Sequence, residues 1–373
     1  MNASRARSLV GLGFLAYALA AAARLLLLTI TTDPRPLPGN EETVVRGITG
    51  LLHPADADAA FAVARAPLSA IALWPVSQAL DASMFSTVLR AISCACFLAA
   101  VALVAVTVKA VSDDWLAAGL AAVILASARD LHSNLDRSPF AAIALALAAL
   151  VMWLSARTGR TERGYASVVL AGVALALAQP LLAPLATIAL LLLAIGQHRP
   201  RWLSVVPVVV ALTVLVLGSL LGLDPLGRGG MPRGGSLWNL QSITGSLQGE
   251  IREAVELAWG TRALAAIVFV GLFSIGVCAL RPECERRARL IGGGICLITA
   301  SYLVTVVPAY VIVAHARAGD MPLTMFVGVQ LGLACVAGIA IAGVSRSALG
   351  SALIGLATVA MLTVPLFDVR SLG

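Results

Sequence analysis

Long apolar runs separated by short polar links dominate the chain and leave few folds open to it. Runs of about 15 to 25 residues recur along the chain, a length suited to crossing a bilayer. Hydrophobic residues make up 60% of the 373 positions and charged residues 12%. A soluble domain carries roughly twice that share of charge, so lipid must solvate most of the surface. The sequence predicts an all-α, polytopic transmembrane bundle of about ten or eleven helices.

The predicted spans follow directly from the apolar runs. They are 8–30, 87–108, 115–128, 139–155, 165–179, 181–196, 203–222, 262–280, 288–313, 321–343 and 347–366. A further stretch, 66–80, contains Pro67 and Pro75 and is predicted to be re-entrant or interfacial. The first run has no clear small-residue cleavage site, so it is expected to remain as a first helix.

Positive charge in the links predicts the orientation. With the amino terminus in the cytoplasm, every inner link carries basic residues. These are Lys109, Arg157, Arg160, Arg163, Arg199, Arg201, Arg281, Arg286, Arg287, Arg289 and Arg346. The segments 31–86, 129–138 and 223–261 then lie outside. Because the basic residues are spread over short links, the net charge of +7 does not indicate nucleic acid. Abundant arginine and alanine are typical of a GC-rich bacterial genome, so a bacterial inner membrane is expected.

The first outer segment contains an amphipathic stretch. Apolar residues at Val44, Val45, Ile48, Leu51 and Leu52 share one face of a helix. We expect this helix, with Asn40 as its N-cap, to lie flat in the membrane interface.

Three charged residues near this helix are candidates for chemistry. Glu41 and Glu42 fall in its first turn, either as a general base at the membrane surface or as charges favoured by the helix dipole. Arg24 lies near the outer end of the first span, where it either snorkels to the interface or meets a lipid phosphate.

Polar side chains are also dense in the other outer segments. The second segment holds Arg129, His132, Asp136 and Arg137, which form either a functional cluster at a membrane boundary or a solvated turn. A metal site built from His53, Asp130 and His132 is an alternative that the spacing does not demand. In the third segment, Arg228 and Arg233 lie in a Gly-rich stretch, read either as a lid over a phosphate or as a linker. Residues 247–259 predict a second interfacial helix.

Several short motifs follow one another in a fixed order within about the first 200 residues. They are Arg24, Glu41-Glu42-Thr43-Val44-Val45-Arg46-Gly47, Arg65-Ala66-Pro67-Leu68, Leu89-Arg90, Asp136-Arg137-Ser138-Pro139 and Ala178-Gln179-Pro180. This order resembles the GT-C class of membrane glycosyltransferases, in particular the bacterial protein mannosyltransferases and the lipid A aminoarabinose transferase. The chain departs from that pattern in its Glu-Glu pair, where Asp-Glu is usual, and in Gln179, where lysine is usual. It also shows no soluble C-terminal domain.

The resemblance implies inverting transfer of a hexosyl or pentosyl group from a polyprenyl-phosphate sugar to a lipid, glycan or protein acceptor on the outer face. Glu41 or Glu42 would act as the base. Substrate and lipid phosphate would be held by Arg24, Arg46, Arg65, Arg129, His132, Asp136, Arg137, Arg228 and Arg233. Residues 1–200 would form the catalytic module and 201–373 the C-terminal helices. A divalent cation is left open as a cofactor, and membrane lipids are expected partners.

Two other classes of function remain open at this stage. A transporter or lipid flippase would bury charges near the membrane midplane, where this chain has few. A non-catalytic membrane subunit related to the enzymes would explain the altered motifs. Substituting Glu41 and Glu42 by glutamine separates the enzyme from both alternatives.

Overall fold

The fold is known from a computed structural model, which describes residues 3–31, 39–51, 66–126, 139–157, 162–183, 186–187, 189–191 and 201–220, together with positions 331, 334, 335, 338, 341 and 342. Every regular element within these residues is helical, and none is a strand. The all-α prediction is therefore confirmed for the described part of the chain.

The helices match most of the predicted spans. They are α1 (Ala3–Thr31), α2 (Gly39–Thr49), α4 (Pro67–Ala79), α5 (Ala82–Ser112), α6 (Trp115–Ala126), α8 (Pro139–Arg157), α9 (Glu162–Ala178) and α11 (Val206–Leu220), with short 3₁₀ turns η1 (Pro180–Leu182) and η2 (Arg201–Val205). The four predicted spans beyond residue 260 lie outside the described ranges, apart from the six positions between 331 and 342. The 181–196 run is described only in part.

Two of the described helices, α1 and α5, are long and apolar enough to cross a membrane. α5 has 31 residues, or about 46 Å at 1.5 Å per residue, which exceeds a hydrocarbon core of about 30 Å. Shorter apolar helices occupy 115–126, 142–157, 164–178 and 202–214. Membrane association is thus compatible with the fold.

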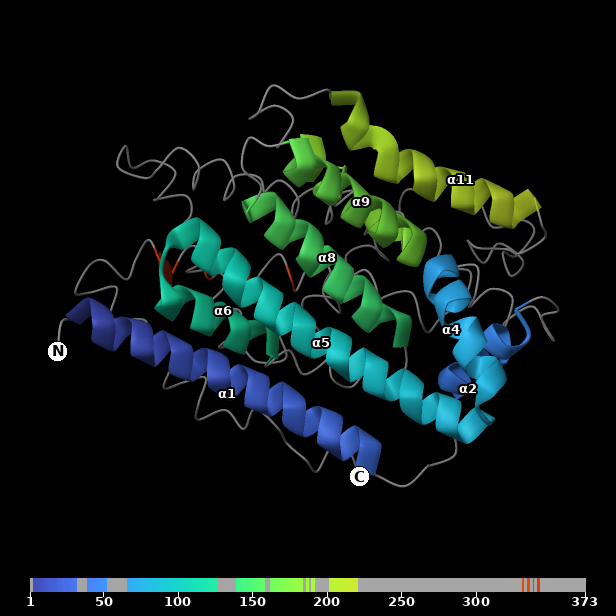
Figure 1. Cartoon of the computed structure of the whole chain (residues 1–373), viewed down its shortest axis with the longest axis horizontal. Coiled ribbons are helices and arrows are strands. Elements are labelled where there is room, and N and C mark those ends of the chain that lie inside the picture. The colour runs from blue at the N-terminus through green and yellow to red at the C-terminus, as the bar shows by residue number, and fades with distance from the viewer. Residues whose placement is uncertain are drawn as a thin grey trace, which may run out of the picture.

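The helices form a row in which each packs on its neighbours. α5 contacts α1, α6 and α8, while α9 contacts both α8 and α11. α1 and α11 lie at opposite edges of this row (Figure 1). Small and β-branched residues such as Ala100, Val101 and Ala118 fill the core between them.

The described part of α6 is enclosed by protein. Every residue from Ala117 to Ala126 is buried, which explains a helix that is apolar on all sides. Part of this cover comes from far along the chain, since a Cβ on Gly338 would lie 2.8 Å from the Ala121 Cβ.

Two glycines allow α1 and α6 to meet backbone to backbone. A side chain on Gly11 would collide with the carbonyl of Trp115, and one on Gly119 would collide with the carbonyl of Gly11. Gly13, two residues further along α1, has open space around it. Glycine is therefore required on one face of α1 and is dispensable on the next.

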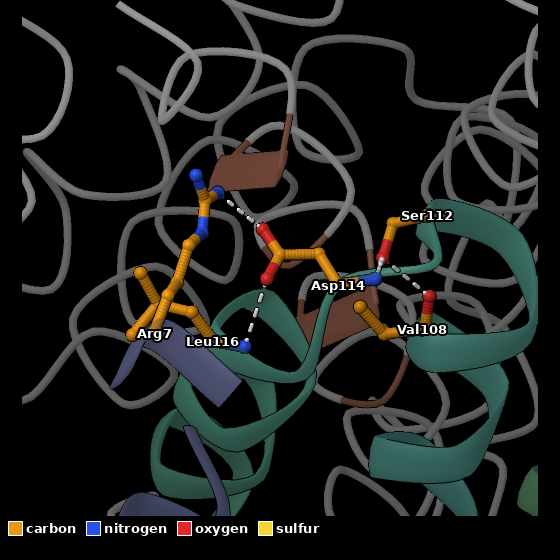
Figure 2. Close-up of polar contacts among 5 residues, drawn as sticks. All are labelled: Arg7, Val108, Ser112, Asp114 and Leu116. Carbon is orange, nitrogen blue, oxygen red and sulfur yellow. Dashed lines mark hydrogen bonds and ion pairs between the residues drawn. The ribbon is translucent and has the colours of Figure 1, made fainter. Parts of the chain in front are cut away.

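A partly buried ion pair fixes the amino end of α1 to the α5–α6 turn (Figure 2). Arg7 Nη2 donates to Asp114 Oδ2 at 2.5 Å, and the two side chains are 32% and 14% exposed. The second oxygen, Asp114 Oδ1, accepts from the Leu116 N–H at 3.0 Å. One carboxylate thus caps α6 and also holds α1.

Candidate functional site

The candidate site is the polar face of α2, the helix that follows α1. The apolar residues Val44, Val45 and Ile48 are buried in a cluster with Leu73 of α4 and Phe85 of α5. Burying one stripe of an amphipathic helix leaves the opposite face directed away from the protein. The predicted helix is confirmed. Its start at Gly39 places Asn40 inside the first turn, so the prediction of Asn40 as the N-cap was wrong.

The partner of the apolar stripe differs from our expectation. We predicted that it would face lipid, but Ile48 is fully buried against protein. Hydrophobic periodicity identifies a face that avoids water and does not distinguish lipid from packed side chains. The helix is consequently held in a fixed place by its neighbours.

Hydrogen bonds fasten the carboxyl end of α2 to α4. The Gln78 side-chain amide donates to the Thr49 carbonyl at 3.0 Å. The Thr49 hydroxyl donates back to the carbonyl of Val45 at 2.9 Å. The contact from Gln78 satisfies the Thr49 carbonyl, which the end of α2 would otherwise leave to solvent.

The exposed face of α2 carries the charged candidates. Glu42 Oε1 and Arg46 Nε lie 3.7 Å apart, one helical turn from each other, with side chains 54% and 48% exposed. Such a loose surface pair contributes little to stability. Both side chains are about half exposed at the surface of α2. The backbone of Glu41 lies in the first turn of α2, and Glu42 and Arg46 are the two candidates that the structure brings together.

The remaining candidates are distributed differently. Arg24 is exposed on α1, a separate helix. The other seven lie outside the described residues: Arg65, Arg129, His132, Asp136, Arg137, Arg228 and Arg233. His53 and Asp130 of the alternative metal site also lie outside them. Among the described residues, no group of three His, Cys, Asp or Glu side chains could hold a metal ion.

Asp81 is a carboxylate at this end of the bundle that our sequence analysis did not single out. Its Oδ1 accepts from the Met84 N–H at 2.8 Å and caps α5. That backbone hydrogen bond, with a second from the Ser83 hydroxyl, lowers the pKa of Asp81 below 3.8. An aspartate directly before a long apolar run is a recognisable N-cap signal, so Asp81 has a structural role.

Comparison of the chain with protein-family models, curated proteins and solved structures gives no significant match.

Proposed function

We propose that this chain is a multi-pass glycosyltransferase of a bacterial inner membrane. It would move a sugar from a polyprenyl-phosphate donor to a lipid, glycan or protein acceptor on the extracytoplasmic face. The proposal includes the predicted helices outside the described residues, which would complete a GT-C-like transmembrane bundle. It also includes a cytoplasmic amino terminus. Its main support in the structure is the placement of α2, which is anchored through its apolar face and directs a carboxylate and an arginine outward.

The position of α2 along α5 places it at the level opposite to the amino end of α1. α2 packs beside Phe85 at the start of α5, whereas Arg7 binds Asp114 just beyond the end of α5. About 29 helical residues separate these levels, or roughly 40 Å. An amino terminus in the cytoplasm would therefore place the polar face of α2 at the opposite membrane surface. The cytoplasmic amino terminus is the one predicted from the basic links.

Transfer of a sugar from a polyprenyl phosphate to a hydroxyl requires one general base and one cationic group. A carboxylate, Glu41 or Glu42, would take the proton of the acceptor hydroxyl while the hydroxyl oxygen attacks the anomeric carbon of the donor sugar. The bond from that carbon to the phosphate oxygen would break, and the polyprenyl phosphate would leave with the electron pair. Arg46 would neutralise the charge on the leaving phosphate. A single displacement of this kind inverts the anomeric configuration.

The decisive experiment measures transfer of radiolabelled sugar from a panel of polyprenyl-phosphate sugars in native membranes. The Glu41→Gln, Glu42→Gln double variant should reduce transfer by about a hundredfold or more because the general base is lost. The two single variants should show which of the carboxylates is that base. Asp81→Asn is the matched control, because asparagine keeps the helix cap and only the charge is removed.

Transfer that is lost in the glutamine variants and retained in Asp81→Asn would assign the base to α2. Equal transfer in wild type and double variant would remove both carboxylates from the mechanism. A folded wild-type chain that transfers no sugar from any donor would favour a transporter or a non-catalytic subunit.

A further inference from the structure

Two tryptophan rings near one end of the bundle each hold a cation against their face. Lys109 Nζ lies 5.7 Å from the centroid of the Trp115 ring. Arg157 Cζ lies 5.3 Å from the centroid of the Trp153 ring. Both rings are partly exposed. An amphipathic ring beside a cation is typical of side chains at the boundary between lipid tails and headgroups.

The two pairs lie toward the same end of the bundle. Phe140, at the start of α8, clusters with Phe85 and Leu89 near the start of α5. α8 and α5 therefore run in the same direction, so their last turns, which hold Arg157 and Lys109, point to one end (Figure 1).

A third tryptophan lies at this end. A Cβ on Gly172 of α9 would lie 3.1 Å from Pro207 of α11, and Ala176 clusters with Ala211. α9 and α11 thus run side by side in the same direction. Trp202, in η2 just before α11, is 69% exposed and follows Arg201 in the sequence.

Beyond Trp202, one face of α11 exposes large apolar side chains. They include Val209, Leu212, Val216 and Leu220, each at least 54% exposed, and Val205 at the end of η2 is 47% exposed. The distance from Trp202 to Leu220 is about 27 Å along a helix, close to the thickness of a hydrocarbon core. At the other edge of the row, Leu9 and Val10 of α1 are more than half exposed. Acyl chains fit apolar surfaces on both outer edges better than a single protein partner does.

We propose that this end of the bundle, with Trp115, Trp153 and Trp202, sits in the headgroup layer of a leaflet rich in anionic phospholipid. The charged side chains described at this end are four cations (Arg5, Arg7, Lys109 and Arg157) and two carboxylates (Asp113 and Asp114). Asp114 and Asp113 pair with Arg7 and Lys109, so Arg5 and Arg157 provide the attraction to lipid phosphate. The proposal rests on the membrane location in the proposed function and is independent of sugar transfer.

The depth of Trp202 is the first test. In a variant that keeps Trp202 and replaces the other five tryptophans by phenylalanine, lipids brominated near the headgroup should quench fluorescence more than lipids brominated near the chain ends. Quenching by aqueous iodide with none by bromolipid would place Trp202 in water. No quenching by either would show that protein covers it. Both results would overturn the proposal.

Lipid selectivity is the second test and needs only limited mutation. Spin-labelled phosphatidylglycerol should be enriched over phosphatidylcholine around the reconstituted full chain. The Arg5→Gln, Arg157→Gln variant should lower that preference by about fivefold for each arginine removed. Arg157→Lys is the matched control, because it keeps the charge and should retain the preference.

Equal association of both lipids with the wild-type chain would overturn the anionic preference. Neither test contains a sugar donor. Failure of sugar transfer with Trp202 at headgroup depth would therefore remove the proposed enzyme and keep the lipid surface. Sugar transfer without lipid selectivity would keep the proposed enzyme and remove the lipid surface.

Discussion

The two ends of the bundle hold their charged side chains in different ways. At the α5–α6 turn, Arg7, Asp114 and Lys109 are partly buried, and each has a close partner. At the α2 end, Glu42 and Arg46 are about half exposed and 3.7 Å apart, while apolar packing beneath them fixes the helix. The Arg7–Asp114 pair is expected to stabilise the fold, whereas the exposed pair on α2 is expected to contribute little to stability. Substitutions at the two ends should therefore affect different properties.

The largest loss of stability is expected at the backbone contact between α1 and the start of α6. Gly11→Ala would place a methyl group against the Trp115 carbonyl, which is backbone and cannot rotate away. We expect a loss of about 3 kcal/mol in the free energy of unfolding, measured by detergent-titrated unfolding. Gly13→Ala is the control and should be neutral or slightly stabilising, since nothing lies near its Cβ. Equal stability of the two variants would show that α1 does not approach α6 this closely.

The Arg7–Asp114 pair should have the next largest effect. Asp114→Asn leaves a partly buried guanidinium without its carboxylate, and we expect a cost of about 2–3 kcal/mol. The double variant with Arg7→Gln should recover part of this loss, because no unpaired charge remains. A double-mutant cycle in unfolding titrations measures the coupling. Additive losses would contradict a direct contact between the two side chains.

The neighbouring Lys109–Asp113 pair provides a contrast within the same turn. Asp113 is 96% exposed, so Lys109→Gln should change stability little. A loss as large as that of Asp114→Asn would show that exposure does not separate the two pairs.

The sequence predicted the helices better than their partners. Length and hydropathy placed α1, α5 and α8 close to their observed bounds, and the apolar spacing of Val44, Val45 and Ile48 predicted α2. The closeness of Arg7 to Asp114 could not be predicted, because 107 residues separate them and periodicity describes only one helix at a time. The same limit hid the contact between Gly11 and α6.

Only the part of the candidate site that lies on a single helix could be predicted from the sequence, because periodicity describes one helix at a time. Glu42 and Arg46 are one turn apart on one helix, so their spacing alone brought them together. Candidates in the second and third outer segments lie outside the described residues, and their place relative to α2 remains a prediction. Asp81 was missed as a residue of interest although its N-cap pattern is visible in the sequence.

A smaller effect is expected from acid. The pKa of Asp81 is lowered by hydrogen bonds that exist only in the folded chain. Its contribution to stability is therefore present above the ordinary pKa of 3.8 and is lost as the pH falls through the lower, folded value. Asp81→Asn keeps the cap and should reduce the change in unfolding midpoint between pH 5 and pH 3. An unchanged pH dependence would assign the acid response to other carboxylates.

The smallest stability effect should come from the proposed catalytic face. Glu42→Gln breaks only a loose, half-exposed pair, so the free energy of unfolding should change by less than about 0.5 kcal/mol. The same variant is expected to lose sugar transfer if Glu42 is the base. Unfolding titration and transfer assay on one preparation measure both quantities. A loss of more than 1 kcal/mol in the free energy of unfolding would instead show that Glu42 stabilises the fold. The charged side chains at both ends of the bundle would then have the same structural role.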